Sequence, residues 1–94
     1  MKLYITINQE FCLRFGLDIV DACILQWFSD FENSGKMTPV LNNGEIFYYV
    51  SYQKVIDDLP LLKIKTHRAI KDRFDKLVEK GLLKKFVRQN FETA

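Results

Sequence analysis

The chain has 94 residues, of which 48% are hydrophobic and 14% aromatic, so it has the size of one small domain with enough apolar side chains for a core. This composition excludes a wholly disordered chain, and no apolar run approaches the roughly 18–20 residues of a membrane span. Polar residues interrupt the first ten positions, which argues against a secretory signal. We expect one domain over residues 1–94, which could be the N-terminal part of a longer protein, and no membrane partner.

The two cysteines, Cys12 and Cys23, lie in segments that are apolar and helical in pattern. Reduced, packed thiols in a cytoplasmic protein are the simplest interpretation. A structural zinc site takes about four ligands, and two cysteines with the single histidine, His67, do not supply them. We therefore expect no metal and no other cofactor.

The net charge of +2 hides a strong asymmetry along the chain. Residues 1–62 carry four cations and eight anions, whereas residues 63–94 carry ten cations and four anions. A basic third joined to an acidic two-thirds indicates a one-sided contact with a polyanion, although a solvated charged helix would give the same count.

The first elements are a short strand and a short helix. Residues 3–7 alternate and are β-branched, which predicts a strand. Asn8 can cap a helix over residues 9–14 that ends at Gly16.

A longer helix should follow from Asp18, a plausible N-cap with Asp21 three residues on, to about Asn33. Its apolar surface is wide, because Ile19 and Leu25 lie outside the main apolar arc. Two interpretations stay open. Either the helix is central and covered on two sides, or the Asp18–Asn33 helix forms a homodimer.

Residues 35–45 contain Pro39 and the turn-forming run Asn42-Asn43-Gly44, so we expect a loop there. Residues 46–50 (IFYYV) are aromatic and β-branched and predict a strand that pairs with residues 3–7 or with later strands.

The rest of the chain has the spacing of a helix-turn-helix followed by a strand. Ser51 caps a helix that Pro60 ends, and Thr66 caps a second helix that stops at Gly81. Residues 82–87 predict a strand, residues 88–90 a turn, and residues 91–94 the start of a returning strand. A complete hairpin would need a few more residues, so the wing is the weakest part of the pattern.

The second helix has the charge pattern of a DNA-reading helix. Its inner face is apolar, its first half and approach are basic, and Asp72, Asp75 and Glu79 occupy its second half. Because anions repel phosphate, we expect the first half to enter a major groove, with Arg68 as the best base-reading side chain. Lys84, Lys85 and Arg88 on the strand and turn would contact phosphates. The predicted DNA-binding residues are Lys63, Lys65, Thr66, His67, Arg68, Lys71, Lys84, Lys85 and Arg88.

Residues 47–85, from Phe47-Tyr48-Tyr49 through Leu59-Pro60 and Lys65-Thr66 to Lys80-Gly81-Leu82-Leu83, resemble a known group of domains. The run is similar to the winged-helix N-terminal domains of phage, plasmid and mobile-element replication proteins, and to the wider set that includes bacterial repressors. The resemblance covers under half of the chain, and the short second wing strand departs from it. It implies an α+β winged helix-turn-helix, a three-helix core with a small antiparallel sheet.

The resemblance and the charge pattern together predict sequence-specific binding of double-stranded DNA, in replication initiation or transcription regulation. The alternative is a winged helix that contacts proteins or dimerises without reading DNA. An enzyme is not expected, because no catalytic constellation is apparent and Asp57-Asp58 fits an exposed helix end better than a metal site.

Overall fold

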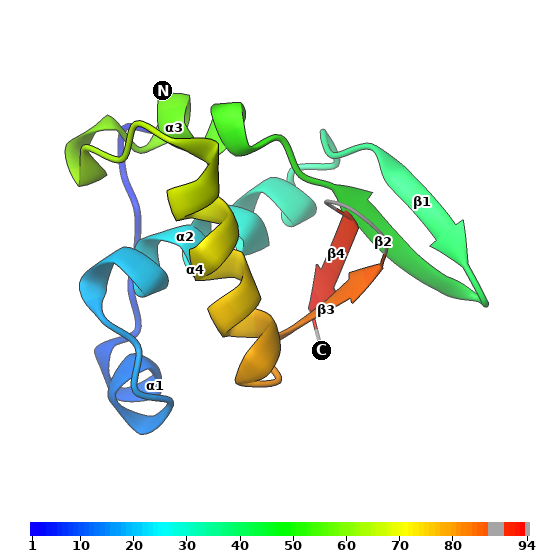
Figure 1. Cartoon of the computed structure of the whole chain (residues 1–94), viewed down its shortest axis with the longest axis horizontal. Coiled ribbons are helices and arrows are strands. Elements are labelled where there is room, and N and C mark those ends of the chain that lie inside the picture. The colour runs from blue at the N-terminus through cyan, green and yellow to red at the C-terminus, as the bar shows by residue number, and fades with distance from the viewer. Residues whose placement is uncertain (87–89, 94) are drawn as a thin grey trace.

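Helices and an antiparallel sheet make up the protein in the computed structural model, which describes residues 1–86 and 90–93. The predicted α+β class is confirmed (Figure 1). The elements in chain order are α1 (Gln9–Arg14), α2 (Ile19–Asn33), β1 (Pro39–Asn42), β2 (Glu45–Tyr49), α3 (Tyr52–Asp58), the 3-10 helix η1 (Pro60–Leu62), α4 (His67–Glu79), β3 (Leu83–Phe86) and β4 (Asn90–Thr93).

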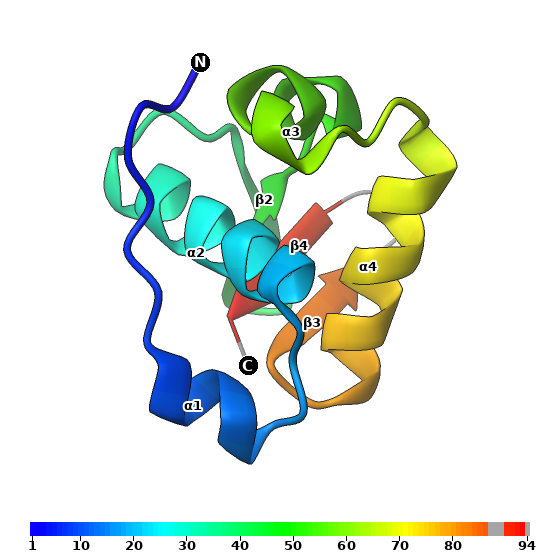
Figure 2. The same ribbon diagram turned by 90° about the vertical axis from the view of Figure 1, so that its left-hand side faces the viewer.

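Helix α2 is the centre of the molecule. Asp18 caps it, and Asp21 bonds back to the Asp18 backbone N–H, so the predicted cap is a full capping box. Figure 2 shows α2 between the N-terminal segment on one side and α4 on the other. Most of its wide apolar surface is covered within the chain, where Leu25 is partly buried, but Ile19 stays exposed. A homodimer through this helix stays a prediction, because Ile19 remains exposed.

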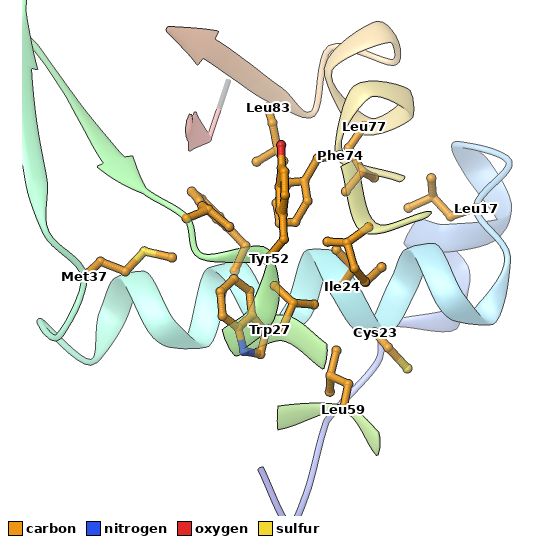
Figure 3. Packing of buried hydrophobic residues seen from close by; sticks show 14 residues of the cluster. Leu17, Cys23, Ile24, Trp27, Met37, Tyr52, Leu59, Phe74, Leu77 and Leu83 are labelled. Atoms are coloured by element: carbon orange, nitrogen blue, oxygen red, sulfur yellow. The ribbon is translucent and has the colours of Figure 1, made fainter. Parts of the chain in front are cut away.

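The core lies where α2, α3, α4 and β3 meet (Figure 3). Phe74 of α4 packs against both Phe28 of α2 and Tyr52 of α3, with ring centroids 6.5 Å and 6.0 Å apart. The fully buried side chains at this junction include Ile24, Trp27, Phe28, Ile70, Phe74, Leu77 and Leu83. This packing fixes α4 against the rest of the domain and leaves its other face exposed.

The described strands form one antiparallel sheet in the order β1-β2-β4-β3. Strand β4 lies inside the sheet, with Phe91 opposite Tyr48 of β2 and Lys85 of β3. The sequence left the second wing strand incomplete, but Asn90–Thr93 is long enough to pair on both sides. The expectation that the hairpin lacks a complete second strand is therefore wrong for residues 90–93.

Two other expectations were wrong. Residues 3–7 form no strand, because no partner strand lies beside them, and Lys2 instead donates its backbone N–H to Asp58 O at 3.1 Å. The loop expected over residues 35–45 contains β1, which turns into β2 through Asn43 and Gly44. Both turn residues have positive φ, 50° and 79°, which suits a two-residue hairpin turn.

Asp58 was expected to be exposed at a helix end, but it is buried. The Trp27 indole N–H donates to Asp58 Oδ2 at 2.9 Å, and the Lys54 ammonium lies 3.4 Å from Oδ1. The carboxylate therefore joins α2 to α3, a role that depends on a contact 31 residues away in sequence.

Candidate nucleic-acid interface

The turn before α4 and the first turn of α4 carry three exposed cations, Lys63, Lys65 and Arg68, which we call the basic approach. Lys63 ends η1 in the left-handed conformation, with φ 57°, and this turns the chain from η1 toward α4. Thr66 then caps α4, its Oγ1 accepting from the Ala69 N–H at 3.2 Å. The positive end of the helix dipole adds to the charge of the three side chains, which makes this end attractive to anions.

The basic approach is distinguished by its lack of internal partners. Within residues 1–86 and 90–93, five cations form no ion pair, and three of these are Lys63, Lys65 and Arg68; the others are Lys36 and Lys80. A cation without a carboxylate partner keeps its full charge for an incoming ligand. The cations of the basic approach are therefore the ones best placed to hold phosphate.

His67 lies at the junction of α3 and α4. Its Nε2 donates to Gln53 Oε1 at 2.9 Å, and its ring meets Tyr52 edge-on with centroids 6.4 Å apart. The ring is thus tied to α3 by one nitrogen while remaining exposed. Thr66 is similarly engaged by its cap. Both predicted residues border the basic approach, and both have a structural contact that explains them without DNA.

Lys71 and Lys85 meet at one carboxylate. Lys71 Nζ lies 2.6 Å from Asp75 Oδ2, and Lys85 Nζ lies 3.5 Å from Asp75 Oδ1. The hydrogen bond from Lys71 is the main reason that the pKa of Asp75 is lowered from its usual 3.8. The sequence predicted that both lysines contact DNA and that Asp75, in the second half of the helix, stays clear of phosphate, whereas the structure brings all three side chains together.

Lys84 on β3 lies 3.3 Å from Glu45 Oε1 of β2, so this predicted phosphate contact has an internal partner. Arg88, the remaining predicted residue, lies outside the described residues. Two polar side chains at the start of α3, Lys54 and Ser51, have structural contacts. Lys54 pairs with Asp58 and lies over the Phe31 ring, and Ser51 Oγ accepts from the Lys54 N–H.

Sequence reasoning missed the ionic cluster between α2 and α4. Arg73 Nη1 lies 2.7 Å from Asp18 Oδ2 and 2.9 Å from Asp21 Oδ1, and Lys76 Nζ lies 2.5 Å from Asp21 Oδ2. Asp21 is fully buried, with 0% of its surface exposed. The sequence shows Asp21 three positions after the N-cap Asp18. This spacing predicts the capping box, but it does not predict that basic residues of α4 pair with the two aspartates.

The hollows of the surface lie elsewhere. One hollow, with a volume of about 400 Å³, is bordered by the N-terminal segment, α1, α2 and the turn before β3, and none of the predicted DNA-binding residues lines it. No group of three His, Cys, Asp or Glu side chains suited to a metal occurs among the described residues. Burial raises the pKa of the Cys23 thiol, and Cys12 adds to the effect.

None of the helices in the described part of the chain is long and apolar enough to cross a membrane. No family model, curated protein or solved structure matches the sequence or the fold. The inference of function therefore depends on the chemistry of the side chains described above.

Proposed function

We propose that the domain is a winged helix-turn-helix that binds double-stranded DNA, with the N-terminal half of α4 directed into the major groove. The observation that carries the proposal is the basic approach: three exposed cations that form no ion pair with any described residue, gathered at the start of a helix whose opposite face is in the core. A helix of this kind presents its first turn to base edges while its dipole and lysines attract phosphate.

The order of the elements supports the same proposal. Helix α3, the turn η1 and helix α4 have helix-turn-helix spacing, and the β3–β4 hairpin follows α4 directly. The resemblance of residues 47–85 to replication-protein and repressor domains favours a role in replication initiation or transcription regulation. In this arrangement Lys63 and Lys65 contact the backbone, and Arg68 reads a base edge.

The test removes two charges at the basic approach and two elsewhere. In Lys63→Ala/Lys65→Ala, affinity for labelled duplexes should fall across all sequences, and the slope of log K against log salt should decrease by about two. Lys36→Ala/Lys80→Ala is the matched control, because it removes two exposed cations that also form no ion pair within the described residues. Its slope should stay close to that of the unaltered protein.

Equal effects of the two double variants would show that only net charge matters and would contradict the proposed interface. An unaltered protein that does not bind duplex at low salt would refute the function itself. Single-stranded competitor should displace less of the protein than duplex does, since the groove-reading geometry needs two strands. A selection of bound sequences from random duplexes would then identify the preferred site.

Self-association is a second candidate, favoured by the β1–β2 hairpin that projects from the helices in Figure 1. Leu41 and Ile46 are cross-strand partners on it, 73% and 52% exposed, and β1 is an edge strand of the sheet. Light scattering over a range of protein concentrations should show dimers that Leu41→Ser abolishes. A monomer at every concentration would refute this candidate.

A further inference from the structure

The Asp75 carboxylate joins α4 to β3, the strand that begins the hairpin. Its two oxygens are divided between two ammonium groups, Oδ2 to Lys71 of α4 and Oδ1 to Lys85 of β3. Each carboxylate oxygen therefore pairs with a different lysine, and the two lysines come from different elements. Two lysines that converge on two oxygens of one anionic group are also the arrangement that holds a phosphodiester, whose two free oxygens carry a single negative charge.

The three side chains are open to an incoming ligand. Lys71 is 48% exposed, Asp75 38% and Lys85 30%. The neighbouring cluster differs in this respect, because the carboxylate of Asp21 on α2, which Arg73 and Lys76 of α4 share, is fully buried. Exposed ion pairs of this kind contribute little stability and exchange partners readily. A ligand anion could therefore replace Asp75 beside Lys71 more easily than it could replace Asp21 beside Arg73 and Lys76.

The position of this group is also suited to DNA. Lys71 lies three residues after Arg68, so the two side chains leave α4 on neighbouring positions of one face. A backbone that passes the basic approach toward β3 would next meet Lys71 and Lys85. Both of these lysines are occupied by Asp75 before any ligand arrives.

We propose that Asp75 occupies the place of a DNA backbone phosphate in the free protein, and that duplex binding exchanges its carboxylate for that phosphate. This inference rests on the proposed DNA-binding function and assigns its regulation. The internal anion lowers affinity for any duplex that does not reach Lys71 and Lys85 together. Only a duplex docked against both α4 and β3 gains the two contacts, so Asp75 favours the fully docked complex over loosely held ones.

The experiment compares two substitutions of equal charge on the same helix. Asp75→Asn releases both lysines, whereas Asp72→Asn removes an exposed carboxylate that has no ion pair in the described part of the chain. Affinity for random duplex should rise about tenfold in Asp75→Asn, with a salt slope larger by about one to two, and no more than about threefold in Asp72→Asn. In a Lys71→Ala/Lys85→Ala background the gain from Asp75→Asn should disappear.

A gain of equal size in both variants, or one that persists without the two lysines, would overturn the inference while leaving the DNA-binding proposal standing. Inorganic phosphate gives a readout that does not depend on DNA. In NMR titrations of the full chain, the backbone signals of residues 71 and 85 should saturate at lower phosphate in Asp75→Asn than in the unaltered protein.

Unchanged titrations at residues 71 and 85 would refute the phosphate site even if the protein bound no duplex. Circular dichroism checks that each variant is folded, and Asp75→Ser replaces Asp75→Asn if the amide variant does not fold. A protein that binds phosphate at these residues but no duplex would refute the proposed function and restrict the site to free phosphate.

Discussion

The α4 region has two halves, residues 63–68 that lead into the helix and residues 71–76 within it, which carry similar basic side chains but use them differently. The basic approach before Ala69 has exposed cations that form no ion pair within the described residues. After Ile70, Lys71, Arg73 and Lys76 each pair with a carboxylate. The difference comes from the carboxylates beside each half, since the N-terminus of α2 supplies Asp18 and Asp21 to Arg73 and Lys76, and α4 itself supplies a carboxylate to Lys71. Charge counted along a sequence therefore overstates the charge that a ligand meets.

The largest expected effect is on stability, in the paired half. Asp21→Ala removes the buried acceptor of Arg73 and Lys76 and the side chain that bonds the Asp18 N–H. The loss should lower the free energy of unfolding by about 2–4 kcal/mol, because a buried network is left without its central anion. Urea unfolding measures this. A loss below about 0.5 kcal/mol, the range of ordinary surface substitutions, would contradict the structural role of the cluster.

Arg68→Ala is the opposite case, a change in the half whose cations form no ion pair with the described residues. It should leave unfolding within about 0.5 kcal/mol of the unaltered protein, because no ion pair in the described chain is lost. Binding to the preferred duplex should weaken by about 1–3 kcal/mol, with relaxed specificity at one base pair. Arg73→Ala is the matched control and should affect stability more than binding. The same affinity across several duplexes before and after Arg68→Ala would eliminate base reading by this side chain.

Acid should weaken the paired half first. Burial would raise the pKa of Asp18, but the Asp21 N–H and the Arg73 guanidinium outweigh it, and the pKa falls from 3.8 to about 2. A lowered pKa means that the stabilisation is present above pH 3.8 and is lost as pH falls toward 2. Thermal unfolding between pH 4 and pH 2 should depend less steeply on pH in Asp18→Asn, which can still cap α2. An identical pH profile would show that Asp18 does not contribute.

The smallest effect concerns the strand after α4. Lys84→Ala should lower the salt slope of duplex binding by less than about one unit, because Glu45 competes with phosphate for this ammonium. Lys63→Ala should produce the larger decrease of the two, since Lys63 has no such competitor among the described residues. Binding isotherms at several salt concentrations give both slopes. A larger decrease for Lys84→Ala would reverse the ranking of the two regions.

Local signals predicted the helices well. Asn8, Asp18, Ser51 and Thr66 were all expected to cap helices, and each side chain accepts a backbone N–H three residues on. The end at Gly81 was predicted from its left-handed requirement, and its φ is 76°. Caps and stops need only neighbouring residues, so the sequence contains them in full.

Strands depended on partners that no local pattern specifies. Residues 3–7 have a strand-like alternation but no neighbour, whereas Pro39–Asn42 has little strand pattern yet pairs with β2. The sequence predicted a turn at Asn43-Gly44. It did not predict a hairpin there, because a hairpin needs a strand on each side of the turn. Proline at the first position of an edge strand is compatible with that pairing.

The candidate site was predictable in composition but not in pairing. The basic first half of α4 followed from the order of charges in the sequence. Asp18 and Arg73 are 55 residues apart, and Lys85 reaches Asp75 only because β3 returns beside α4. Contacts of that range depend on the tertiary fold, so the sequence could not separate free cations from paired ones.

The position of β4 has a consequence for how the chain reaches its fold. The β1–β2 hairpin joins neighbouring residues, but β4 must insert between β2 and β3, with Phe91 meeting Tyr48 from 43 positions earlier in the chain. A nascent or proteolysed chain that ends before Asn90 would expose the edges of both β2 and β3, and unpaired edges promote aggregation. Because β4 follows all of the described helices in the chain, the sheet is completed only after they have been synthesised, and limited proteolysis of growing chains should find the helical part protected first.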